Sequence, residues 1–410
     1  MNDSQFEVLI VGGGPAGAFA AERLARGGAR VALFDGRPSN EPKACGGGVT
    51  SKALRMWPYL LEAGGHTVSE IDMHSPKGTR VRLKLKEPFI IYSRSALDSY
   101  LLERARNAGV IVHQACVKAD IDSTSDTHEW TVRTREGQTW RGRVLVAADG
   151  ANSPIARRLA GALPKEEMEV AFGYRAPLSQ SDVEARTVIA FLPGWAGYAW
   201  AFPRLDHISF GIATAQNTFD HQRLDQLLWN FMVNYYGKAG RTNTSLWTRA
   251  EDTHGGQSDA DVEEGLRASV EKYAARIPGL APETWKRRRA CGKDWALLGD
   301  AAGFADPITG EGIYYALRSA ELFAEAYLDG SLESYEESWR ADFGRELWRA
   351  ARMRRRFYGQ FGGAPFTEQM VRLGRIHAGI RRTLSELVAG DQGYLDLKHT
   401  LMRRFLWPVS

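Results

Sequence analysis

The chain has 410 residues and a formal net charge of +4, with 44% hydrophobic and 25% charged residues. This length allows two or three domains, and the composition excludes a disordered, collagen-like or coiled-coil chain. No apolar run reaches about 18 residues, so we expect no membrane-spanning helix. Because the first residues lack a basic segment and the three cysteines are scattered, we expect no signal peptide, no disulfide framework, no metal site and a cytoplasmic location.

The chain begins with a strand, a glycine-rich turn, a helix and a second strand. Residues 6–11 are largely apolar, as in a strand buried on both faces of a parallel sheet. An Ala-rich stretch over 18–26 predicts the helix, and residues 30–34 predict the second strand. The turn between them has Gly-x-Gly-x-x-Gly spacing, and its candidate cofactor contacts are Gly12, Gly14, Ala16 and Gly17.

The turn and the acid that follows it predict a dinucleotide site. In this pattern the first glycine makes a tight turn, the second lets a pyrophosphate approach the backbone, and the third lets helix and strand pack closely. The free N–H groups at the start of the helix attract phosphate. Asp35 ends the second strand, where its carboxylate can bind both hydroxyls of an adenosine ribose that carries no 2′-phosphate. An ordinary glycine turn is the alternative.

The middle of the chain predicts alternating strands and one helix. Residues 68–92 alternate as short strands, and residues 95–107 predict a helix with Ser95 as its N-cap. Strands are expected over about 110–122 and 129–135.

The second half of the chain changes from strands to helices. Residues 168–215 are strand-like and rich in aromatic residues, and residues 224–235 follow helical spacing. An apolar strand at 295–298 leads into a second glycine-rich stretch, after which the chain is predominantly helical. Because this strand returns the chain to the nucleotide-binding sheet, we expect interleaved domains.

Two later motifs place further carboxylates at strand ends. Asp149 lies in Val-Ala-Ala-Asp-Gly-Ala-Asn-Ser-Pro (146–154), and Asp300 lies in Leu-Gly-Asp-Ala-Ala-Gly (298–303). A carboxylate at a strand end can bind a ribityl hydroxyl, while the next helix presents N–H groups to a phosphate or a flavin carbonyl. Each motif alone could be a structural turn. Together and in this order they favour FAD over NAD.

At these three motifs the sequence resembles the FAD-dependent oxidoreductases related to p-hydroxybenzoate hydroxylase. Within that superfamily, Lys-Ala-Cys-Gly-Gly-Gly (43–48), Tyr-Ala-Trp-Ala-Phe-Pro (198–203) and Thr-Gly-Glu-Gly-Ile-Tyr-Tyr-Ala (309–316) resemble the geranylgeranyl reductases. The resemblance covers roughly residues 6–330. It implies an α/β fold in which a Rossmann-like FAD-binding domain is interleaved with an antiparallel β-sheet substrate domain, followed by a helical C-terminal region.

The expected domains are discontinuous along the chain. The FAD-binding domain is expected over 1–67, 93–165 and 290–330, the substrate-binding domain over 68–92 and 166–289, and a helical basic C-terminal region over 331–410.

The resemblance also implies which residues hold the ADP half and the ribityl chain of FAD. Gly17 and Asp35 would bind the ADP half, and the backbone of Val117 would touch the adenine. Arg94 would contact the cofactor at the start of the predicted helix, and Asp300 would bind the ribityl chain.

The flavin ring would lie against two glycine-containing segments. The residues that the resemblance assigns to the ring are Cys45, Gly46, Gly48, Gly312 and Ile313. Gly47 departs from the family pattern, because relatives often carry a glutamate at this position. This departure concerns the substrate more than the chemistry.

The candidate catalytic residues are Cys45, Tyr198 and Trp200. Cys45 lies in a glycine-rich loop, where it would donate a proton or tune the flavin, or else pack as a small hydrophobe. Tyr198 and Trp200 share one strand face by alternation with Phe202. With the nearby Tyr174, Phe191 and Trp195 they predict an aromatic-lined tunnel for an apolar chain, although core packing of a sheet gives the same pattern.

The resemblance implies reduction of carbon–carbon double bonds in a geranylgeranyl-type prenyl chain of a lipid, quinone or related isoprenoid. Reduced FAD would deliver a hydride to one alkene carbon, and an acid would protonate the other. The electrons would come from NAD(P)H or from a ferredoxin-like carrier. Two alternatives remain: a flavin-dependent monooxygenase or halogenase acting on an aromatic or apolar substrate, and a prenyl-binding escort without flavin. The intact Asp35, Asp149 and Asp300 disfavour the escort.

The positive charge is concentrated at the end of the chain. Residues 339–410 contain 14 Arg and Lys against 6 Asp and Glu. Arginines recur at helical spacing over 345–356, interleaved with aromatic residues. A basic amphipathic helix of this kind is suited to the surface of an anionic membrane, and a solvated helical face explains it equally well. We expect no nucleic-acid partner, because no recognition motif accompanies the charge.

Overall fold

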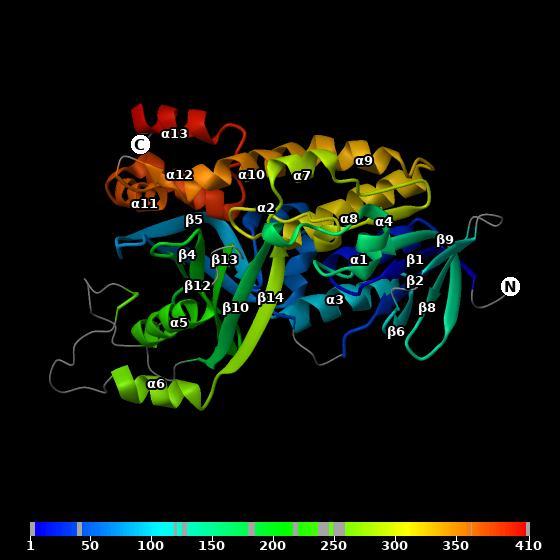
Figure 1. Cartoon of the computed structure of the whole chain (residues 1–410), viewed down its shortest axis with the longest axis horizontal. Helices are drawn as coiled ribbons and strands as arrows, with labels where there is room; N and C mark the ends of the chain where they lie inside the picture. Colours follow the sequence, from blue (N-terminus) through cyan, green and yellow to red (C-terminus); the bar gives the residue numbers. More distant parts are fainter. Residues whose placement is uncertain are drawn as a thin grey trace. The chain divides into compact units, whose positions relative to one another are not determined.

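The structure is a computed structural model that describes residues 5–38, 43–118, 121–124, 129–178, 185–215, 220–236, 246–248, 259–361 and 363–406. The chain forms two compact units (Figure 1). Unit 1 comprises Met1–Lys43, Arg94–Met168 and Arg276–Arg352, and unit 2 comprises Ala44–Ser93, Glu169–Ala275 and Met353–Ser410. The boundaries of the two units differ from those of the predicted domains. Residues 44–67 lie in unit 2, and the expected C-terminal region is divided between the units at residue 352.

Unit 1 contains a mixed sheet with strand order β6–β2–β1–β9–β8–β7, in which β15 also pairs with β9. Its strands are β1 (Gln5–Val11), β2 (Val31–Asp35), β6 (Ile111–Gln114), β7 (Asp122–Thr124), β8 (Glu129–Arg133), β9 (Thr139–Ala147) and β15 (Trp295–Leu297). The pairs among β6, β2, β1, β9 and β15 are parallel. All five side chains of β2 are buried, as predicted for a strand covered on both faces.

Helices connect and cover these strands. They are α1 (Pro15–Arg26), α3 (Arg94–Asn107), α4 (Pro154–Ala160), α7 (Pro282–Arg287), α8 (Ile313–Leu328), α9 (Ser334–Trp339) and the first part of α10 (Arg345–Phe357). The apolar face predicted for α3 is buried at Leu97 and Leu101. The N-cap prediction at Ser95 is wrong, because the helix already begins at Arg94 and Ser95 lies inside its first turn.

Unit 2 contains a predominantly antiparallel sheet with strand order β14–β10–β13–β12–β11–β4–β5–β3. Its strands are β3 (Gly48–Val49), β4 (His66–His74), β5 (Arg80–Ile91), β10 (Met168–Pro177), β11 (Val188–Phe191), β12 (Gly197–Pro203), β13 (His207–Ala215) and β14 (Glu271–Pro278). The β4–β5 hairpin confirms the short strands predicted over 68–92, whereas β14 was not predicted, because its sequence lacks a regular apolar alternation.

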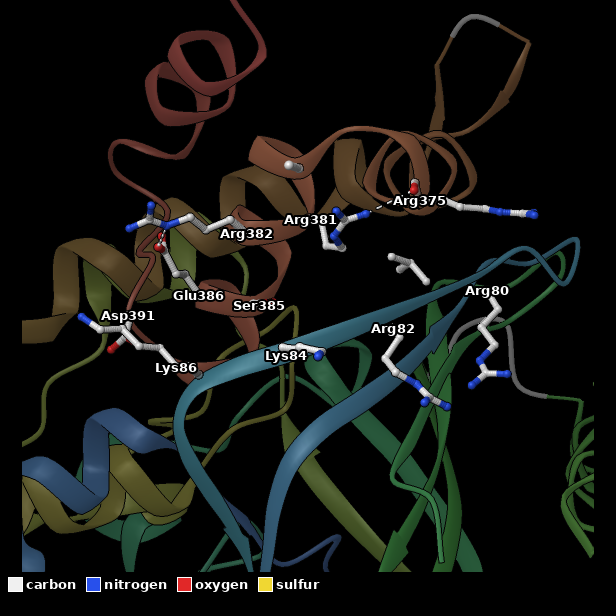
Figure 2. Close-up of a pocket in the computed structure, with 13 residues that line it drawn as sticks. Arg80, Arg82, Lys84, Lys86, Arg375, Arg381, Arg382, Ser385, Glu386 and Asp391 are labelled. Carbon is white, nitrogen blue, oxygen red and sulfur yellow. Dashed lines mark hydrogen bonds and ion pairs between the residues drawn. The ribbon is translucent and has the colours of Figure 1, made fainter. Parts of the chain in front are cut away.

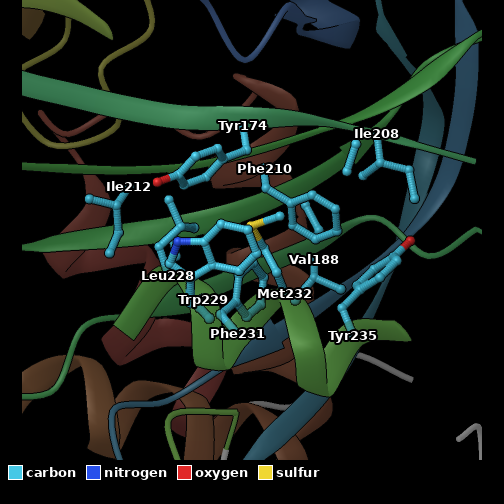
Figure 3. Packing of buried hydrophobic residues seen from close by; sticks show 14 of the residues in the cluster. Tyr174, Val188, Ile208, Phe210, Ile212, Leu228, Trp229, Phe231, Met232 and Tyr235 are labelled. Atoms are coloured by element: carbon cyan, nitrogen blue, oxygen red, sulfur yellow. The ribbon is translucent and has the colours of Figure 1, made fainter. Parts of the chain in front are cut away.

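Each face of this sheet is covered by helices. On one face, α5 (His221–Tyr236) and α6 (Asp259–Arg267) enclose a core to which the strands contribute Tyr174, Phe210 and Ile212 (Figure 3). On the other face, α11 (Phe366–Ile376) and α12 (Ala378–Ala389) pack against the hairpin.

Short elements complete unit 2. They are α2 (Ser51–Met56), β16 (Gln360–Phe361), β17 (Ala364–Pro365) and α13 (Leu397–Leu406). None of the helices in the described ranges combines the length and apolarity that a membrane crossing needs.

Gly211 fixes the position of the Trp200 indole. The two residues are direct cross-strand partners on β13 and β12, and a Cβ atom on Gly211 would lie 2.1 Å from Cζ2 of Trp200. We predict that Gly211→Ala lowers the free energy of unfolding by about 1–3 kcal/mol, because the buried indole must move. Chemical denaturation and near-UV circular dichroism measure the two effects.

Gly265→Ala is the matched control for this substitution. Gly265 lies in α6, and a Cβ atom there would meet nothing within 4 Å. Alanine should leave the stability unchanged or raise it by up to about 1 kcal/mol. Equal stability of the Gly211→Ala variant and the wild type would contradict the tight contact.

Candidate active site

The glycine turn after β1 has no room for side chains at two of its predicted positions. Gly12 has a φ of 112°, and a Cβ atom there would lie 2.3 Å from the carbonyl oxygen of Ala148. A Cβ atom on Gly17 would lie 1.9 Å from the carbonyl oxygen of Gly12. The tight turn and the close packing of helix on strand are therefore both present, as the motif predicts.

The start of α1 is open toward its N-terminal side. Gly14 is the N-cap, no side chain among the described residues caps the helix there, and a Cβ atom on Gly14 would meet nothing within 4 Å. The first N–H groups of a helix have no intrahelical acceptor. The backbone around Ala16 and Gly17 thus provides donors and space for a phosphate group.

Asp35 is held by a chain of buried charges. Its carboxylate is 6% exposed and accepts hydrogen bonds from the backbone N–H and Nε of Arg37 at 3.2 and 3.3 Å. Arg37 also donates to Asp98 at 2.7 Å, and Arg94 donates to the same Asp98 carboxylate at 3.0 Å. Burial opposes the charge of Arg37, but Asp98 and Asp35 outweigh it and raise the pKa of its guanidinium. Arg94 therefore belongs to the Asp35 network.

Position 13 also requires glycine, although the motif did not predict it. A Cβ atom there would lie 2.6 Å from Cγ of Asp35. The constraint arises from the carboxylate on the neighbouring strand, so the spacing of the glycines alone does not reveal it.

Val117 follows β6, the strand that pairs with β2. Gln114 lies opposite Asp35 in the register, and its side-chain amide donates to the Asp35 carbonyl oxygen at 2.8 Å. Val117 itself forms an isolated bridge with Thr134. This places the Val117 backbone on the segment that leaves the Asp35 end of the sheet.

One carboxylate oxygen of Asp149 is buried without a hydrogen-bond donor. Its Oδ1 atom has no hydrogen-bond partner among the described residues. Burial raises the pKa of the carboxyl from its ordinary value of 3.8 to about 6, although a hydrogen bond with Ser153 acts in the opposite direction. Ser153 in turn caps α4 by accepting from the N–H of Ala156 at 2.8 Å. An unpaired buried oxygen is costly, and a ligand hydroxyl or N–H would satisfy it.

Asp300 lies where β15 ends and close to the start of α8. Its Oδ1 atom would be 3.0 Å from a Cβ atom on Gly312, so the missing side chain lets the carboxylate approach the helix terminus. Ile313 begins α8 and is buried. Lys43, to which we assigned no role of its own, places its Nζ 3.9 Å from Oδ2 of Asp300.

Arg288 holds the Asp300 turn in place through hydrogen bonds to backbone carbonyls. The sequence did not predict it as a site residue. It is 5% exposed and donates to the carbonyl oxygens of Ala301 and Ala302 at 3.0 and 3.1 Å. It also donates to Ala160 and Gly161 at the end of α4 at 3.1 and 2.9 Å. Burial lowers its pKa to about 10, with the charge of Glu336 opposing the shift. Because its partners are backbone carbonyls, no side-chain pattern in the sequence indicates this role.

These residues of unit 1 fit an FAD molecule. The open start of α1 suits a pyrophosphate, Asp35 suits an adenosine ribose, and the unsatisfied Asp149 and the partly exposed Asp300 suit hydroxyl groups of a ligand.

The Cys45 loop in unit 2 has a conformation that requires glycine at position 47. Gly47 has a φ of 81°, and a Cβ atom there would lie 2.2 Å from the Tyr92 carbonyl oxygen. Its N–H donates to the Cys45 sulfur at 3.3 Å. The buried Arg204 donates to the carbonyl oxygens of Cys45 at 2.6 Å and Gly46 at 3.3 Å. A glutamate at position 47 is incompatible with this path of the backbone.

The predicted aromatic stripe on β12 lies directly beside this loop. Ring centroids are 5.9 Å apart for Tyr198 and Trp200, and 6.3 Å apart for Trp200 and Phe202. A Cβ atom on Gly46 would lie 3.2 Å from Phe202 and 3.6 Å from Nε1 of Trp200. A Cβ atom on Gly48 would lie 2.4 Å from Phe89, whose ring centroid is 6.3 Å from that of Phe202. The loop and the stripe therefore form one packed surface within unit 2.

The expectation of a single aromatic lining is wrong for two of its members. Tyr174 packs in the core beneath α5 and donates to Asp225 at 2.7 Å. Trp195 packs against the same core and lies under the guanidinium of Arg223. Both pack with Ala199 and Ala201, the β12 residues that alternate with the stripe, and they therefore lie on the opposite face of the sheet from it.

Comparison with known proteins gives a family match and several relatives. Residues 5–194 match the FAD binding domain family. The chloroplastic geranylgeranyl diphosphate reductase of Nicotiana tabacum is 28% identical over 371 residues, covering 83% of this chain and 72% of the relative. The digeranylgeranylglycerophospholipid reductase of Methanosphaerula palustris is 27% identical over 387 residues, covering 87% of each protein.

Solved structures share the fold over nearly the whole chain. A geranylgeranyl bacteriochlorophyll reductase-like protein from Thermoplasma acidophilum matches with a TM-score of 0.71 and 21% identity, covering 97% of this chain and 99% of the other. A flavin-dependent brominase matches with a TM-score of 0.69 and 16% identity, covering 98% and 99%. At sequence identities of 21% and 16%, these matches show the fold alone, and they confirm the predicted fold class.

Asp149 should make the stability of the cofactor-free protein depend on pH. Its carboxyl has a pKa of about 6 in the folded chain and 3.8 ordinarily, so between these values the folded state holds the extra proton. The free energy of unfolding therefore falls as pH rises through this window, by up to about 3 kcal/mol. Asp149→Asn should remove this slope in denaturation curves, and the exposed Asp329→Asn should retain it. An unchanged slope in Asp149→Asn would contradict the burial of the charge.

Arg288→Met should weaken flavin binding, because the Asp300 turn loses its hydrogen bonds and buried carbonyls are left without donors. We expect the FAD dissociation constant to rise at least about 10-fold, which corresponds to about 1.4 kcal/mol. Fluorescence titration and the flavin content after gel filtration measure it. Arg287→Met removes an exposed neighbouring arginine and is the matched control. Wild-type affinity in a folded Arg288→Met variant would refute the positioning role.

Proposed function

We propose that this chain, which belongs to the FAD-dependent oxidoreductases and is similar in sequence to geranylgeranyl reductases, saturates carbon–carbon double bonds of a prenyl chain in a lipid, quinone or related isoprenoid. The observation that carries this proposal is the extent of the sequence match. Relatives named for reduction of geranylgeranyl diphosphate and of digeranylgeranylglycerophospholipid align with 83% and 87% of the chain. Such alignments include residues of both units.

The residues of unit 1 would hold the cofactor. The α1 terminus at Gly14 would bind the pyrophosphate, Asp35 the adenosine ribose, and Asp300 the ribityl chain. Bound FAD supplies the hydride chemistry, while the protein supplies orientation and exclusion of water. Arg288 keeps the Asp300 turn in place through backbone hydrogen bonds.

The residues of unit 2 would act on the substrate side. Arg204 orients the Cys45 loop, which packs beside the aromatic stripe at Gly46. Tyr198 is only partly buried and would offer apolar ring surface to a prenyl chain, with the buried Trp200 indole packed beside it at 5.9 Å between ring centroids. We assign Cys45 as the candidate proton donor or flavin-tuning group, and Trp200 and Tyr198 as substrate contacts. Electrons would arrive from NAD(P)H or a ferredoxin-like carrier.

Product mass tests this function. Photoreduced enzyme is incubated with geranylgeranyl diphosphate, a geranylgeranyl glycerophospholipid or a prenylquinone, with and without oxygen. We expect a gain of two hydrogens per double bond in at least one substrate, independent of oxygen. Incorporation of oxygen or halide instead would establish the monooxygenase or halogenase alternative, and a purified protein that binds no flavin would support the escort alternative.

Two variants test the roles of the substrate-side residues in the same assay. Trp200→Ala should lower the reduction rate at least about 10-fold, which corresponds to about 1.4 kcal/mol of transition-state stabilisation, while the flavin spectrum is retained. Cys45→Ser should lower the rate, because it removes the thiol assigned as proton donor or flavin-tuning group, whereas Cys116→Ser, the control for a partly exposed thiol, should not. Full activity of the Trp200→Ala variant would mean that the aromatic stripe only packs in the core and does not contact the substrate.

A further inference from the structure

A basic groove lies between β5 and the helices α11 and α12 of unit 2 (Figure 2). Its volume is about 700 Å³. The cofactor and substrate roles assigned above do not use it, and its lining residues come from segments far apart in the sequence.

The strand side of the groove is built by alternation along β5. Val81 and Leu83 point into the core that the strand shares with α11 and α12. The residues between and beyond them are exposed and cationic, namely Arg80, Arg82, Lys84 and Lys86. Because side chains alternate along a strand, these four cations project from the face of β5 opposite to Val81 and Leu83, and they contribute to the lining of the groove at the strand.

The helical side adds three arginines. Arg375 lies in the last turn of α11, and Arg381 and Arg382 lie on α12 (Figure 2). The Arg381 guanidinium donates to the carbonyl oxygens of Gly374 and Arg375 at 3.3 and 3.2 Å. These bonds hold the guanidinium in place without neutralising its charge.

Carboxylates near the groove compensate only part of this charge. Asp72 is shared between Arg80 at 2.8 Å and Arg82 at 3.0 Å. Glu386 is likewise shared between two arginines, Arg382 at 2.9 Å and Arg404 at 2.7 Å. Glu70 also pairs with Arg82 at 3.6 Å and with Lys84 at 3.7 Å, so two carboxylates serve three cations on the strand side, and an excess of positive charge remains.

Two groove cations have no carboxylate at all. Within the described part of the chain, Lys86 and Arg375 form no ion pair, and both side chains are exposed. They are therefore available to an anionic ligand.

Exposed apolar side chains adjoin the cations. Ile376 directly follows Arg375 and is 80% exposed. On α13, Phe405 and Leu406 are 51% and 63% exposed. The ring of His377 stacks on Phe405 at 5.2 Å and lies 3.2 Å from its carbonyl oxygen, which links the end of α11 to α13. Apolar side chains beside unpaired cations form the pattern of a membrane-surface contact.

We propose that this groove binds the phosphate headgroups of an anionic membrane, while Ile376, Phe405 and Leu406 enter the lipid interface. Charge complementarity carries the proposal, because cations near an anionic bilayer surface add to the binding energy of a peripheral protein. The exposed aliphatic groups distinguish a bilayer from a soluble polyanion, which offers them no apolar phase. The proposal goes beyond the reduction reaction and holds whichever bond the enzyme reduces.

Vesicle flotation with the full-length holoenzyme tests the proposal. Vesicles of pure phosphatidylcholine are compared with vesicles that also contain phosphatidylglycerol. We expect binding to the anionic vesicles and its loss as salt is raised, because the Debye length shrinks from about 10 Å at 0.1 M to about 3 Å at 1 M. Equal binding to both vesicle types, or to neither, would overturn the proposal.

Charge variants locate the contact. The double variant Lys86→Ala/Arg375→Ala should lower the partition coefficient on anionic vesicles about 30-fold, because it removes the two unpaired groove cations. The double variant Arg106→Ala/Arg135→Ala removes the same charge from exposed positions in unit 1 and should bind nearly as the wild type does. Equal losses in both double variants would mean that net charge alone attracts the protein, which overturns the groove as the site.

An apolar variant and soluble anions separate the remaining explanations. Ile376→Ser should lower vesicle binding while retaining the salt dependence, because it removes insertion and keeps the charge. Inorganic pyrophosphate or duplex DNA that binds the wild type but not Lys86→Ala/Arg375→Ala, in the absence of vesicle binding, would identify a soluble anion as the occupant and overturn the membrane proposal. Flavin content and product formation are measured in parallel, so that failure of membrane binding is distinguishable from failure of the reductase function.

Discussion

The close approach of α1 to the turn after β1 determines where the rest of unit 1 can lie. A Cβ atom on Gly17 would lie 1.9 Å from the Gly12 carbonyl oxygen, so the helix can approach this closely only because position 17 is glycine. The next contact outward involves Gly299, where a Cβ atom would lie 3.3 Å from Ala16 and 3.2 Å from Ala316. The turn that carries Asp300 is therefore packed against the same helix that offers its N-terminus to a phosphate. Two cofactor motifs far apart in the sequence share one structural support.

The parts of this site that depend on local spacing could be predicted from the sequence. The glycine turn, the strand ends at Asp35, Asp149 and Asp300, and the alternation on β12 all follow from short-range rules. The residues that were missed depend on distant partners. Arg288 binds backbone carbonyls of two other segments, and Gly13 is restricted by a carboxylate on the neighbouring strand.

The burial of side chains also distinguishes between interpretations that the sequence left open. Alternation alone could not show which aromatic residues share a surface, because Tyr174 and Tyr198 lie on neighbouring stretches of similar composition. The cores on the two faces of the unit 2 sheet separate them. The positive charge of the chain end was visible in the sequence, but the groove was not. It forms only when α11 and α12 pack against β5, whose own cations lie far earlier in the chain.

We propose that the enzyme transfers the electrons of its reduced flavin to an isolated prenyl double bond. Anaerobic stopped-flow absorbance tests it directly: the holoenzyme is photoreduced, mixed with a geranylgeranyl substrate, and monitored for the return of the oxidised flavin spectrum. We predict reoxidation without oxygen, at a rate that depends on the concentration of the prenyl substrate and is absent with its fully saturated analogue. A reduced flavin that remains unchanged with every prenyl substrate and is reoxidised only when oxygen is admitted would contradict the claim.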